Sequence, residues 1–545
     1  MLGILSVINP IILRNRVNMQ NLIEAKQISL TFPDSPLHLF SGIDLFLTDE
    51  LQALIGRNGV GKSYLAAILA DKLKSSEGSV HRFCNIGYLA QGETVLAGTA
   101  GDILGTSQIQ KISIRVLDGE GTPEDFNFMD DKWNWEVETE ALLAEGELTL
   151  DILDRSFKTL SGGEQTRLKL LALKKQGCDF LILDEPSNHL DRDGRMWLAQ
   201  WIKNFSGGVL LVTHDTILLK QVQIVYELTP TGLSVSHGGW NDWLQSQEQL
   251  LLGAQRDAAQ TKKELQQAKR DQQMAQEKTE QRQSRGKNQR KDSNQSKIIL
   301  DRELGRSEAT QSRKAKLHDD RTQNAADQAA SAKAQLEIIE PLAIVTAPPE
   351  AASNPLLHLS NIVLPFGATA PISLIVNKGE RIAITGKNGS GKSTLLKVIS
   401  GQLEAEQGEI AVTESYRLMD QHFSFLDKEL SALDNFRQQS SGWTEDLYRT
   451  RLAQLRIKGD AAIKPVHTLS GGEQLKVALA CLFCGATAPA LLLLDEPDNH
   501  LDIESKNLLQ QALHDYTGAL ILVSHDEKFI EAIGNTDYIR LENTV

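Results

Sequence analysis

Cysteine is scarce in this sequence. The 545 residues include four cysteines, Cys84, Cys178, Cys481 and Cys484, which are too few for a dense disulfide framework. Cys481 and Cys484 have the spacing of half a zinc or redox motif, but they stand in an apolar helical run and the sequence holds no second such pair. Buried structural thiols are therefore the better interpretation of both residues.

Long apolar runs are also missing. No stretch of the sequence approaches the ~18–20 apolar residues that cross a membrane as a helix. The mildly apolar first 18 residues contain Pro10, and their positive charges follow the apolar part instead of preceding it, which argues against a secretory signal. We expect residues 1–18 to be either a weakly ordered extension or a misassigned start, with Met19 opening the first strand segment.

Positive charge is in deficit over the whole chain. With 57 Lys and Arg against 71 Asp and Glu, the formal net charge is −14, which by itself argues against a nucleic-acid partner. A hydrophobic content of 41% and a charged content of 23% are typical of a globular protein, and the length indicates several domains.

Proline is absent between residues 231 and 340, and the charge balance reverses in the same stretch. Residues 246–340 hold 19 basic and 15 acidic residues, a net charge of +4, which leaves 38 basic and 56 acidic residues elsewhere, a net charge of −18. Seven basic and two acidic residues lie in residues 278–297. Sparse apolar positions at helical spacing predict long, mostly exposed helix.

We predict that this stretch forms an antiparallel helical hairpin with a basic tip, broken near Gly286. On charge alone, a solvated spacer is the simpler interpretation. A spacer between two domains, however, needs nothing this long. A basic tip among phosphates would gain affinity by releasing counterions.

One long pattern occurs twice. Residues 160–191 and residues 469–502 both contain LSGGEQ, an apolar run, LDEP and NHLD, in that order. A pattern of this length does not recur by accident, so the protein is an internal tandem repeat. In each copy an apolar run leads into a carboxylate pair, as expected for a buried parallel strand whose C-terminal tip carries ligand-binding groups.

Each half also contains the complete pattern G-x-x-x-x-G-K-[ST]. In the first half this pattern stands between a predicted strand and a predicted helix. The glycines allow backbone N–H groups to surround phosphates, and the helix N-terminus adds partial positive charge. We expect the lysine to reach the β- and γ-phosphates and the serine that follows it to hold Mg²⁺. The two P-loops are Gly56, Arg57, Asn58, Gly59, Val60, Gly61, Lys62 and Ser63, and Gly386, Lys387, Asn388, Gly389, Ser390, Gly391, Lys392 and Ser393.

Further polar residues recur at the strand ends of both halves. A glutamine stands 35 residues after the first glycine of each P-loop, and a histidine follows a later apolar strand. Alone, each would be interpreted as a polar strand end or a core histidine. Recurrence favours a glutamine that contacts Mg²⁺ or the attacking water, and a histidine that senses the γ-phosphate. These residues are Gln91, His214, Gln421 and His525.

The recurring carboxylate pair completes the expected catalytic set. Its aspartate suits metal coordination, and its glutamate suits polarising the water that cleaves the γ-phosphate. These residues are Asp184, Glu185, Asp495 and Glu496. Because both halves keep every catalytic residue type, we expect two competent sites.

These residues resemble the ATP-binding cassette (ABC) ATPases. The resemblance implies an α/β fold with two P-loop cassettes in tandem, with ATP and Mg²⁺ as ligands and ATP hydrolysis as the reaction. It also implies head-to-tail pairing of the cassettes, in which the signature loop of each caps the ATP of the other. The signature residues that would do so are Ser161, Gly162 and Gly163, and Ser470, Gly471 and Gly472.

The twin cassettes and the charged linker together resemble the ABC-F subfamily. In that subfamily the linker enters the ribosomal E site and points towards the P-site transfer RNA, and members act as translation factors or protect the ribosome from antibiotics. The resemblance implies a cytoplasmic protein that binds the ribosome and pairs its cassettes within one chain. The alternative is the ATPase subunit of a membrane ABC transporter, which would need a partner permease.

We expect five segments in the chain. They are the extension (1–18), the first cassette (19–245), the helical linker (246–340), a flexible joint (341–355) and the second cassette (356–545). Gln91 and Ser161 are 70 positions apart, whereas Gln421 and Ser470 are 49 apart. ABC-F members with a full arm insert more residues here, so we expect a reduced arm or none.

Overall fold

The computed structural model describes residues 21–31, 38–92, 98–188, 190–290, 297–339, 342, 344–440, 442–499, 501–534 and 536–541. The expected N-terminal extension lies outside these residues. The chain divides into two compact units, one made of Met1–Asn241 with Leu342–Val545 and the other of Asp242–Pro341. The first unit contains both cassettes, and the second contains the linker.

The first cassette is built on a six-stranded sheet in the order β5-β6-β7-β3-β8-β9. All neighbouring strands are parallel except β8 and β9. Its elements are β1 (Ile23–Thr31), β2 (His38–Leu47), β3 (Leu51–Ile55), α1 (Lys62–Leu69), β4 (Glu77–Arg82), β5 (Ile86–Leu89), α2 (Ala100–Leu104), α3 (Ser107–Leu117), α4 (Pro123–Met129), α5 (Trp135–Glu145), α6 (Gly162–Lys175), β6 (Phe180–Asp184), α7 (Arg192–Asn204), β7 (Gly208–Val212), α8 (Thr216–Leu219), β8 (Ile224–Thr229) and β9 (Gly232–His237).

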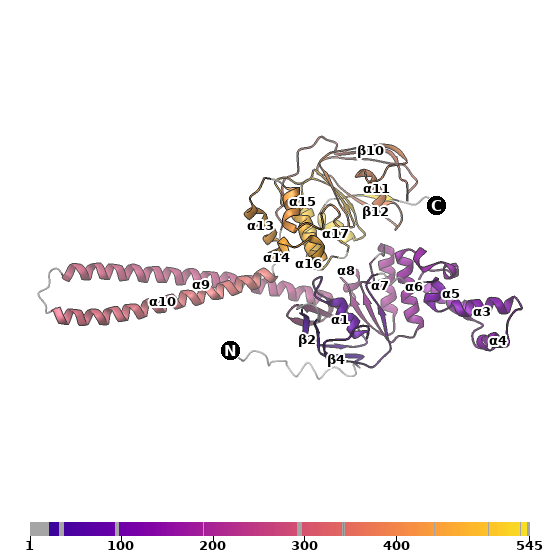
Figure 1. Cartoon of the computed structure of the whole chain (residues 1–545), viewed down its shortest axis with the longest axis horizontal. Coiled ribbons are helices and arrows are strands. Elements are labelled where there is room, and N and C mark those ends of the chain that lie inside the picture. Colours follow the sequence, from indigo (N-terminus) through magenta and orange to yellow (C-terminus); the bar gives the residue numbers. More distant parts are fainter. Residues whose placement is uncertain are drawn as a thin grey trace. The chain divides into compact units, whose positions relative to one another are not determined.

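The second cassette repeats this plan with a five-stranded parallel sheet in the order β14-β15-β16-β12-β17. Its elements are β10 (Leu357–Val363), β11 (Ile372–Val376), β12 (Arg381–Gly386), α11 (Lys392–Ile399), β13 (Gln407–Val412), β14 (Tyr416–Met419), α12 (Ala432–Gln439), α13 (Glu445–Gln454), α14 (Asp460–Ile463), α15 (Gly471–Phe483), β15 (Leu491–Asp495), α16 (Ile503–Asp515), β16 (Ala519–Val523), α17 (Glu527–Ile533) and β17 (Asp537–Leu541). Each cassette adds a three-stranded antiparallel sheet, β2-β1-β4 or β11-β10-β13. The tandem α/β fold is therefore confirmed (Figure 1).

The central strands explain the apolar runs of the repeat. Every residue of β6 and β7 is buried, and β16 is buried along its whole length. Parallel strands covered on both faces need continuous apolar sequence, because alternate side chains point to opposite faces and neither face meets water. The apolar runs before Asp184 and Asp495 reflect this position at the centre of the sheets.

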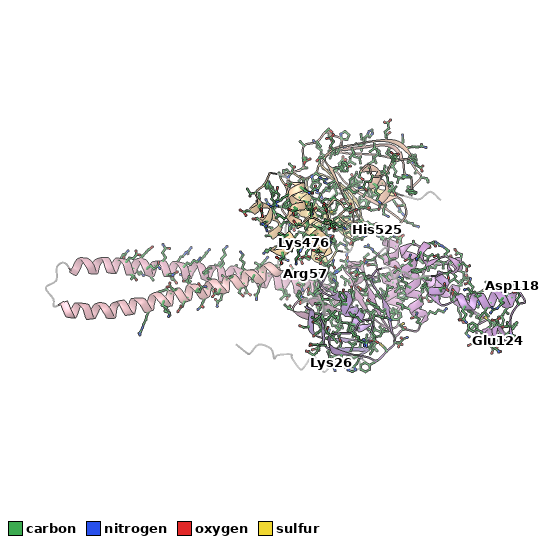
Figure 2. All side chains as sticks on the ribbon, viewed as in Figure 1. Lys26, Arg57, Asp118, Glu124, Lys476 and His525 are labelled. Carbon is green, nitrogen blue, oxygen red and sulfur yellow. The ribbon has the colours of Figure 1, made fainter. Side chains whose placement is uncertain are left out.

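Two extra helices, α3 and α4, account for the longer first cassette. They follow α2 and precede α5, whereas in the second cassette α13 follows α12 directly. Arg115 on α3 forms an ion pair with Asp125 on α4, with Nε to carboxylate oxygen at 2.9 Å. Thr122 caps α4 in a capping box with Asp125. The additional residues thus form a short helical hairpin, with Asp118 and Glu124 near its turn (Figure 2).

The linker consists of two long helices, α9 (Gly239–Arg290) and α10 (Lys297–Ile339). They lie side by side, and Gln272 donates to Asp319 across them at 2.6 Å (Figure 1). The predicted hairpin is confirmed, but its predicted break near Gly286 is wrong, because α9 continues to Arg290. One glycine costs a helix only about 1 kcal/mol, which the surrounding helical turns tolerate. The tip itself, residues 291–296, and the side chains of residues 282–290 lie outside the described residues.

Part of the expected flexible joint is bonded to the second cassette. The N–H of Ala347 donates to Phe483 O at 2.7 Å, and the N–H of Glu350 donates to Ala488 O at 2.8 Å. The Thr346 hydroxyl donates to Asp515 O at 3.2 Å. Leu342 and Ile344 are buried in the core of that cassette.

Tyr516 provides a test of the core of the second cassette. Its side chain is fully buried, its ring makes an edge contact with Phe483, and its hydroxyl donates to Pro489 O at 2.6 Å. We expect Tyr516→Phe to lower the free energy of unfolding by about 1–3 kcal/mol, because the Pro489 carbonyl loses its buried partner. Tyr538→Phe, at a side chain that is 54% exposed, should change it by less than about 0.5 kcal/mol. Urea midpoints of the two variants measure the difference, and equal midpoints would contradict it.

Candidate functional site

The strand register brings the expected site residues of the first cassette to one edge of its sheet. Leu89 pairs with Leu183, Asp184 pairs with Val212, and Val212 also lies at the level of Leu54 on β3. The P-loop, Gln91, the carboxylate pair and His214 follow these strand ends directly. In open α/β sheets ligands bind at the carboxyl ends of parallel strands. Sequence order alone could not establish that these four segments meet.

Both P-loops have the close approach that their first glycine predicts. A β-carbon on Gly56 would lie 2.3 Å from Leu228 O, and one on Gly386 would lie 2.5 Å from Leu541 O. Both residues have positive φ, 147° and 150°. Glycine is therefore required at each position both by space and by backbone conformation.

The P-loop lysines are buried and held over their own loops. Lys62 Nζ donates to Gly56 O at 2.7 Å and to Arg57 O at 3.1 Å, and Lys392 donates to Gly386 O and Lys387 O, both at 3.0 Å. Burial lowers the pKa of both lysines. Each ammonium is thus pre-positioned where a phosphate group on the loop would compensate its charge.

The two glutamates share an unusual backbone conformation. Glu185 and Glu496 both have φ of 48°, in the left-handed region that non-glycine residues seldom adopt. Each N–H donates to the neighbouring strand, Glu185 to Val212 O at 2.7 Å and Glu496 to Val523 O at 2.9 Å. Such conformations cost about 1–3 kcal/mol and persist where the surroundings enforce them, often at functional sites. No feature of the sequence indicates this backbone conformation.

The same two glutamates differ in electrostatics. Burial raises the pKa of Glu185 to about 8, with Asp184 adding to the effect and Lys62 opposing it. Burial also raises the pKa of Glu496, but nearby His525, then Lys392 and Arg195, outweigh it and hold that pKa below its usual value. Gln421 donates to Glu496 Oε2 at 2.6 Å.

The glutamines and histidines lie beside these carboxylates. Gln91 Oε1 accepts from the Ser63 hydroxyl at 3.4 Å. His214 Nε2 is 4.0 Å from Glu185, and His525 Nε2 is 3.5 Å from Glu496. Burial, together with the Lys62 cation, lowers the pKa of His214 to about 3, so its imidazole is neutral near pH 7. A neutral imidazole can donate one hydrogen bond to a phosphate oxygen.

The aspartate of each pair fits a magnesium site. Both carboxylate oxygens of Asp184 are buried and have no hydrogen-bond partner among the described residues. Asp495 Oδ1 accepts from the Ser393 hydroxyl at 2.9 Å. Across the described residues no group of three or more His, Cys, Asp and Glu is arranged to hold a metal ion. The aspartate carboxylate and the P-loop serine hydroxyl suit Mg²⁺, which is held by one or two protein oxygens together with phosphate oxygens and water.

Each signature loop begins a helix. Ser161 caps α6 in a capping box with Glu164, and Ser470 caps α15 in a capping box with Glu473. The glycines that follow each serine form the first helical turn, where backbone N–H groups have no partner within the helix. These N-termini can therefore receive phosphate oxygens. The S-x-x-E spacing is that of a capping box, but the spacing alone does not establish that a helix begins at the serine.

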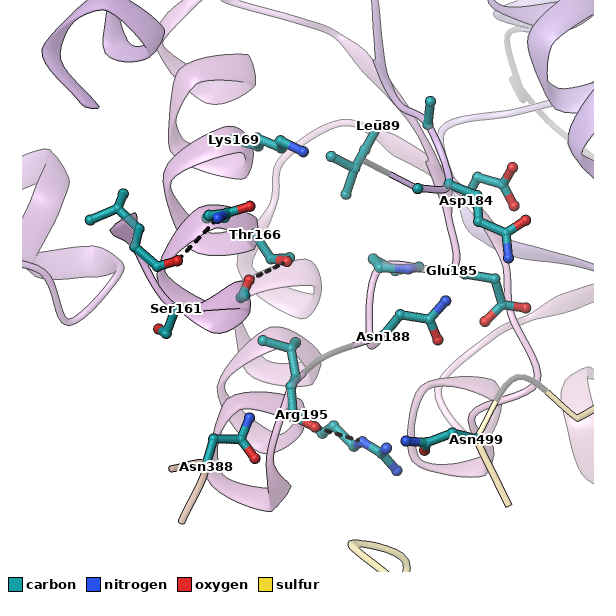
Figure 3. Close-up of a pocket in the computed structure, with 18 of the residues that line it drawn as sticks. Leu89, Ser161, Thr166, Lys169, Asp184, Glu185, Asn188, Arg195, Asn388 and Asn499 are labelled. Carbon is teal, nitrogen blue, oxygen red and sulfur yellow. Dashed lines mark hydrogen bonds between the residues drawn. The ribbon is translucent and has the colours of Figure 1, made fainter. Parts of the chain in front are cut away.

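Contacts between the cassettes are head-to-tail. A β-carbon on Gly59 would lie 4.0 Å from Cβ of Ser470, and Asn58 N donates to Asp502 at 2.8 Å. At the other site a cavity of about 880 Å³ is lined by Ser161 and Gly162 of the first cassette and Asn388 of the second (Figure 3). Each P-loop therefore faces the signature loop of the other cassette.

Sequence reasoning missed several ionic contacts at this junction. Arg57 Nε is 2.7 Å from Glu504 of the second cassette, and Arg456 of that same cassette lies 2.5 Å from the other carboxylate oxygen of Glu504. Arg192 pairs with Glu527 at 2.5 Å. The sequence shows these charged residues, but it does not reveal that Arg57 and Arg192 have partners more than 300 residues away.

The fold and the site together define a P-loop nucleotide-binding protein with two composite sites. The family model described as ABC transporter matches residues 46–188 and 369–499. A protein of Bacillus subtilis (strain 168) named as an ATP-binding protein, YdiF, is 31% identical over 525 residues, covering 88% of this chain and 74% of YdiF. The chain thus belongs to the ATP-binding cassette family and, within it, to the ABC-F subfamily.

Two further likenesses extend along most of the chain. The energy-dependent translational throttle protein EttA of Escherichia coli (strain K12) is 27% identical over 529 residues, covering 91% of this chain and 88% of EttA. A solved structure titled RNase-L Inhibitor, at 17% identity, superposes with a TM-score of 0.51 and covers 93% of this chain and 86% of that one. The latter supports the fold alone.

Proposed function

We propose that this protein is a cytoplasmic ATPase that binds the ribosome at its E site and acts on translation through its linker. ATP and Mg²⁺ would bind at both composite sites, and hydrolysis would reset the paired cassettes. The linker would contact ribosomal RNA and the P-site transfer RNA. The role would be that of a translation factor or of an antibiotic-resistance ribosomal protection protein.

The observation that carries this proposal is the helical hairpin of the linker. Its helices span 52 and 43 residues, and most of their described side chains are exposed. Two such helices bury too little apolar surface to serve as a folded core of their own. Their net charge is +4, whereas the rest of the chain carries −18. The positive hairpin can bind the phosphate groups of RNA, and the negative remainder limits non-specific binding to nucleic acid.

Two findings support the same proposal. EttA, a relative along most of this chain, is named for an action on translation. Within the described residues, no helix is long and apolar enough to span a membrane. A transporter ATPase would instead act through a separate permease, and the hairpin has no evident use there.

Sedimentation with ribosomes tests the proposal. We expect the Glu185→Gln/Glu496→Gln variant to pellet with ribosomes in ATP and to stay in the supernatant in ADP, because only ATP holds the cassettes closed. Adding Lys62→Ala and Lys392→Ala, which remove the P-loop ammonium groups, should abolish pelleting. A variant that remains in the supernatant with ATP would overturn the proposal, and sedimentation with membranes would favour a transporter ATPase.

A further inference from the structure

A basic residue follows the Asp of NHLD in each cassette. Arg195 lies on α7 and Lys506 on α16, each four residues after that aspartate. Only 12% of the Arg195 side chain and 16% of the Lys506 side chain are exposed. A buried cation is costly unless opposite charges or a ligand compensate it. The groups around Arg195 and around Lys506 therefore indicate the role of each side chain.

Lys506 is compensated within its own cassette. Its Nζ lies 2.5 Å from Asp526 and 3.9 Å from Asp498. Asp526 directly follows His525 in sequence, and Asp498 lies two residues after Glu496. Two carboxylates are sufficient to balance this single ammonium.

Arg195 has less compensation in its own cassette. Asp215, the counterpart of Asp526, lies 3.8 Å from its Nε, and the counterpart of Asp498 is the uncharged Ser187. Arg195 Nε also donates to Leu190 O, at 3.3 Å. One carboxylate at the edge of ion-pair distance and one carbonyl do not balance a guanidinium that is mostly buried.

The side chain of Arg195 instead reaches the second cassette. It lines the cavity of about 880 Å³ together with Glu496, Asn499 and His525. Figure 3 shows it extending from the first cassette towards Asn499. The same cavity contains Asn388 of the second P-loop and Ser161 of the first signature loop. Arg195 thus lies among the groups that would surround the triphosphate bound by the second P-loop.

We propose that Arg195 is a further catalytic residue, supplied by the first cassette to the ATP site of the second. Its guanidinium offers phosphate oxygens a rigid fork of donors. Phosphoryl transfer depends chiefly on positive charge around the γ-phosphoryl group. Water attacks the γ-phosphorus and passes a proton to Glu496 while the bond from phosphorus to the ADP oxygen breaks. Arg195 exchanges no proton and stabilises the charge that moves onto the phosphate oxygens.

The inference rests on the proposed ATP hydrolysis, and single-site backgrounds test it separately. In a Glu185→Gln chain only the second-cassette site turns over, and in a Glu496→Gln chain only the first. We expect Arg195→Met to slow ATP turnover at least ~1,000-fold in the Glu185→Gln chain, the lower end of the range known for arginines acting on phosphoryl transfer. In the Glu496→Gln chain the change should stay within about twofold, because Arg195 lies at the other site.

The distribution of the loss between the two backgrounds decides the outcome. A larger loss in the Glu496→Gln chain would mean that Arg195 supports its own cassette through Asp215, and it would overturn the proposal. Equal losses in both chains would indicate a general structural role and would overturn it as well. Absence of turnover in the unsubstituted protein would instead count against the proposed ATPase function.

Nucleotide release gives a readout that does not depend on turnover. In the double Glu→Gln chain, Arg195→Met should speed release of a fluorescent ATP analogue several-fold and leave release of the matching ADP analogue unchanged. Arg195→Lys, which keeps the charge without the fork, should fall between Met and Arg. Lys203→Met, at an exposed cation on the same helix, is the matched control and should change neither rate. Unchanged ATP release from a folded Arg195→Met chain would contradict the proposal.

Discussion

Replacing both Glu185 and Glu496 with glutamine is expected to reduce ATP turnover at least ~100-fold, the usual contribution of a positioned general base. Glutamine keeps the size and the hydrogen-bonding shape of glutamate but cannot take a proton from the attacking water. Both positions are held in the same left-handed conformation beside β7 and β16, the strands that end two residues before His214 and His525. The substitution should therefore remove the chemistry without disturbing the site.

The double variant should also keep ATP bound for longer. In the proposed function, hydrolysis separates the head-to-tail contacts, so without it ATP should leave more slowly than from the unsubstituted chain. Phosphate release and the dissociation rate of a fluorescent ATP analogue measure the two effects. Glu140→Gln/Glu531→Gln changes one exposed glutamate in each cassette and should leave both rates as they are. Turnover that survives the Glu185/Glu496 double variant would assign water activation to other residues.

Deleting residues 277–294 should abolish the proposed effect on translation while leaving nucleotide binding intact. The deletion removes residues 277–290 of α9 and residues 291–294, and with them six of the seven basic residues in 278–297. It leaves α10, which begins at Lys297, at its full length. The P-loops and signature loops belong to the other compact unit, so their affinity for ATP should be unchanged. In-vitro translation and ATP-analogue binding, measured on the same preparation, test both halves of this prediction.

A matched variant separates length from charge. Substituting glutamine at every basic position of the deleted stretch keeps the hairpin length: Lys278, Arg282, Arg285, Lys287, Arg290 and Lys291. If charge matters, ribosome affinity should fall and its dependence on salt should weaken, because fewer counterions are released. If length alone matters, this variant should behave as the unsubstituted protein does. Full translational activity in the deletion itself would show that the linker is a spacer.

The expectations drawn from sequence were strongest where a function needs residue types within one continuous segment. The P-loops lie between a strand and a helix, and the carboxylate pairs lie at the ends of buried strands, as expected, because phosphate binding and two-sided burial each demand a local pattern. The linker helices were recognised from composition. Their turn was misplaced, since a single glycine such as Gly286 is too weak a signal to end a helix that its neighbours support.

The sequence by itself determined two repeated nucleotide-binding cassettes, the residue types expected to act in them and a long helical linker with a cluster of basic residues in 278–297. Only the tertiary structure decided which side chains meet across the cassettes: Asn58 with Asp502, Arg57 with Glu504, and Arg195 with the cavity beside Glu496. The reason is that a local pattern encodes what one segment can bind. A contact between side chains that are hundreds of residues apart depends on how two folded surfaces pack together. Each of those surfaces is formed by residues from several separate segments of the sequence.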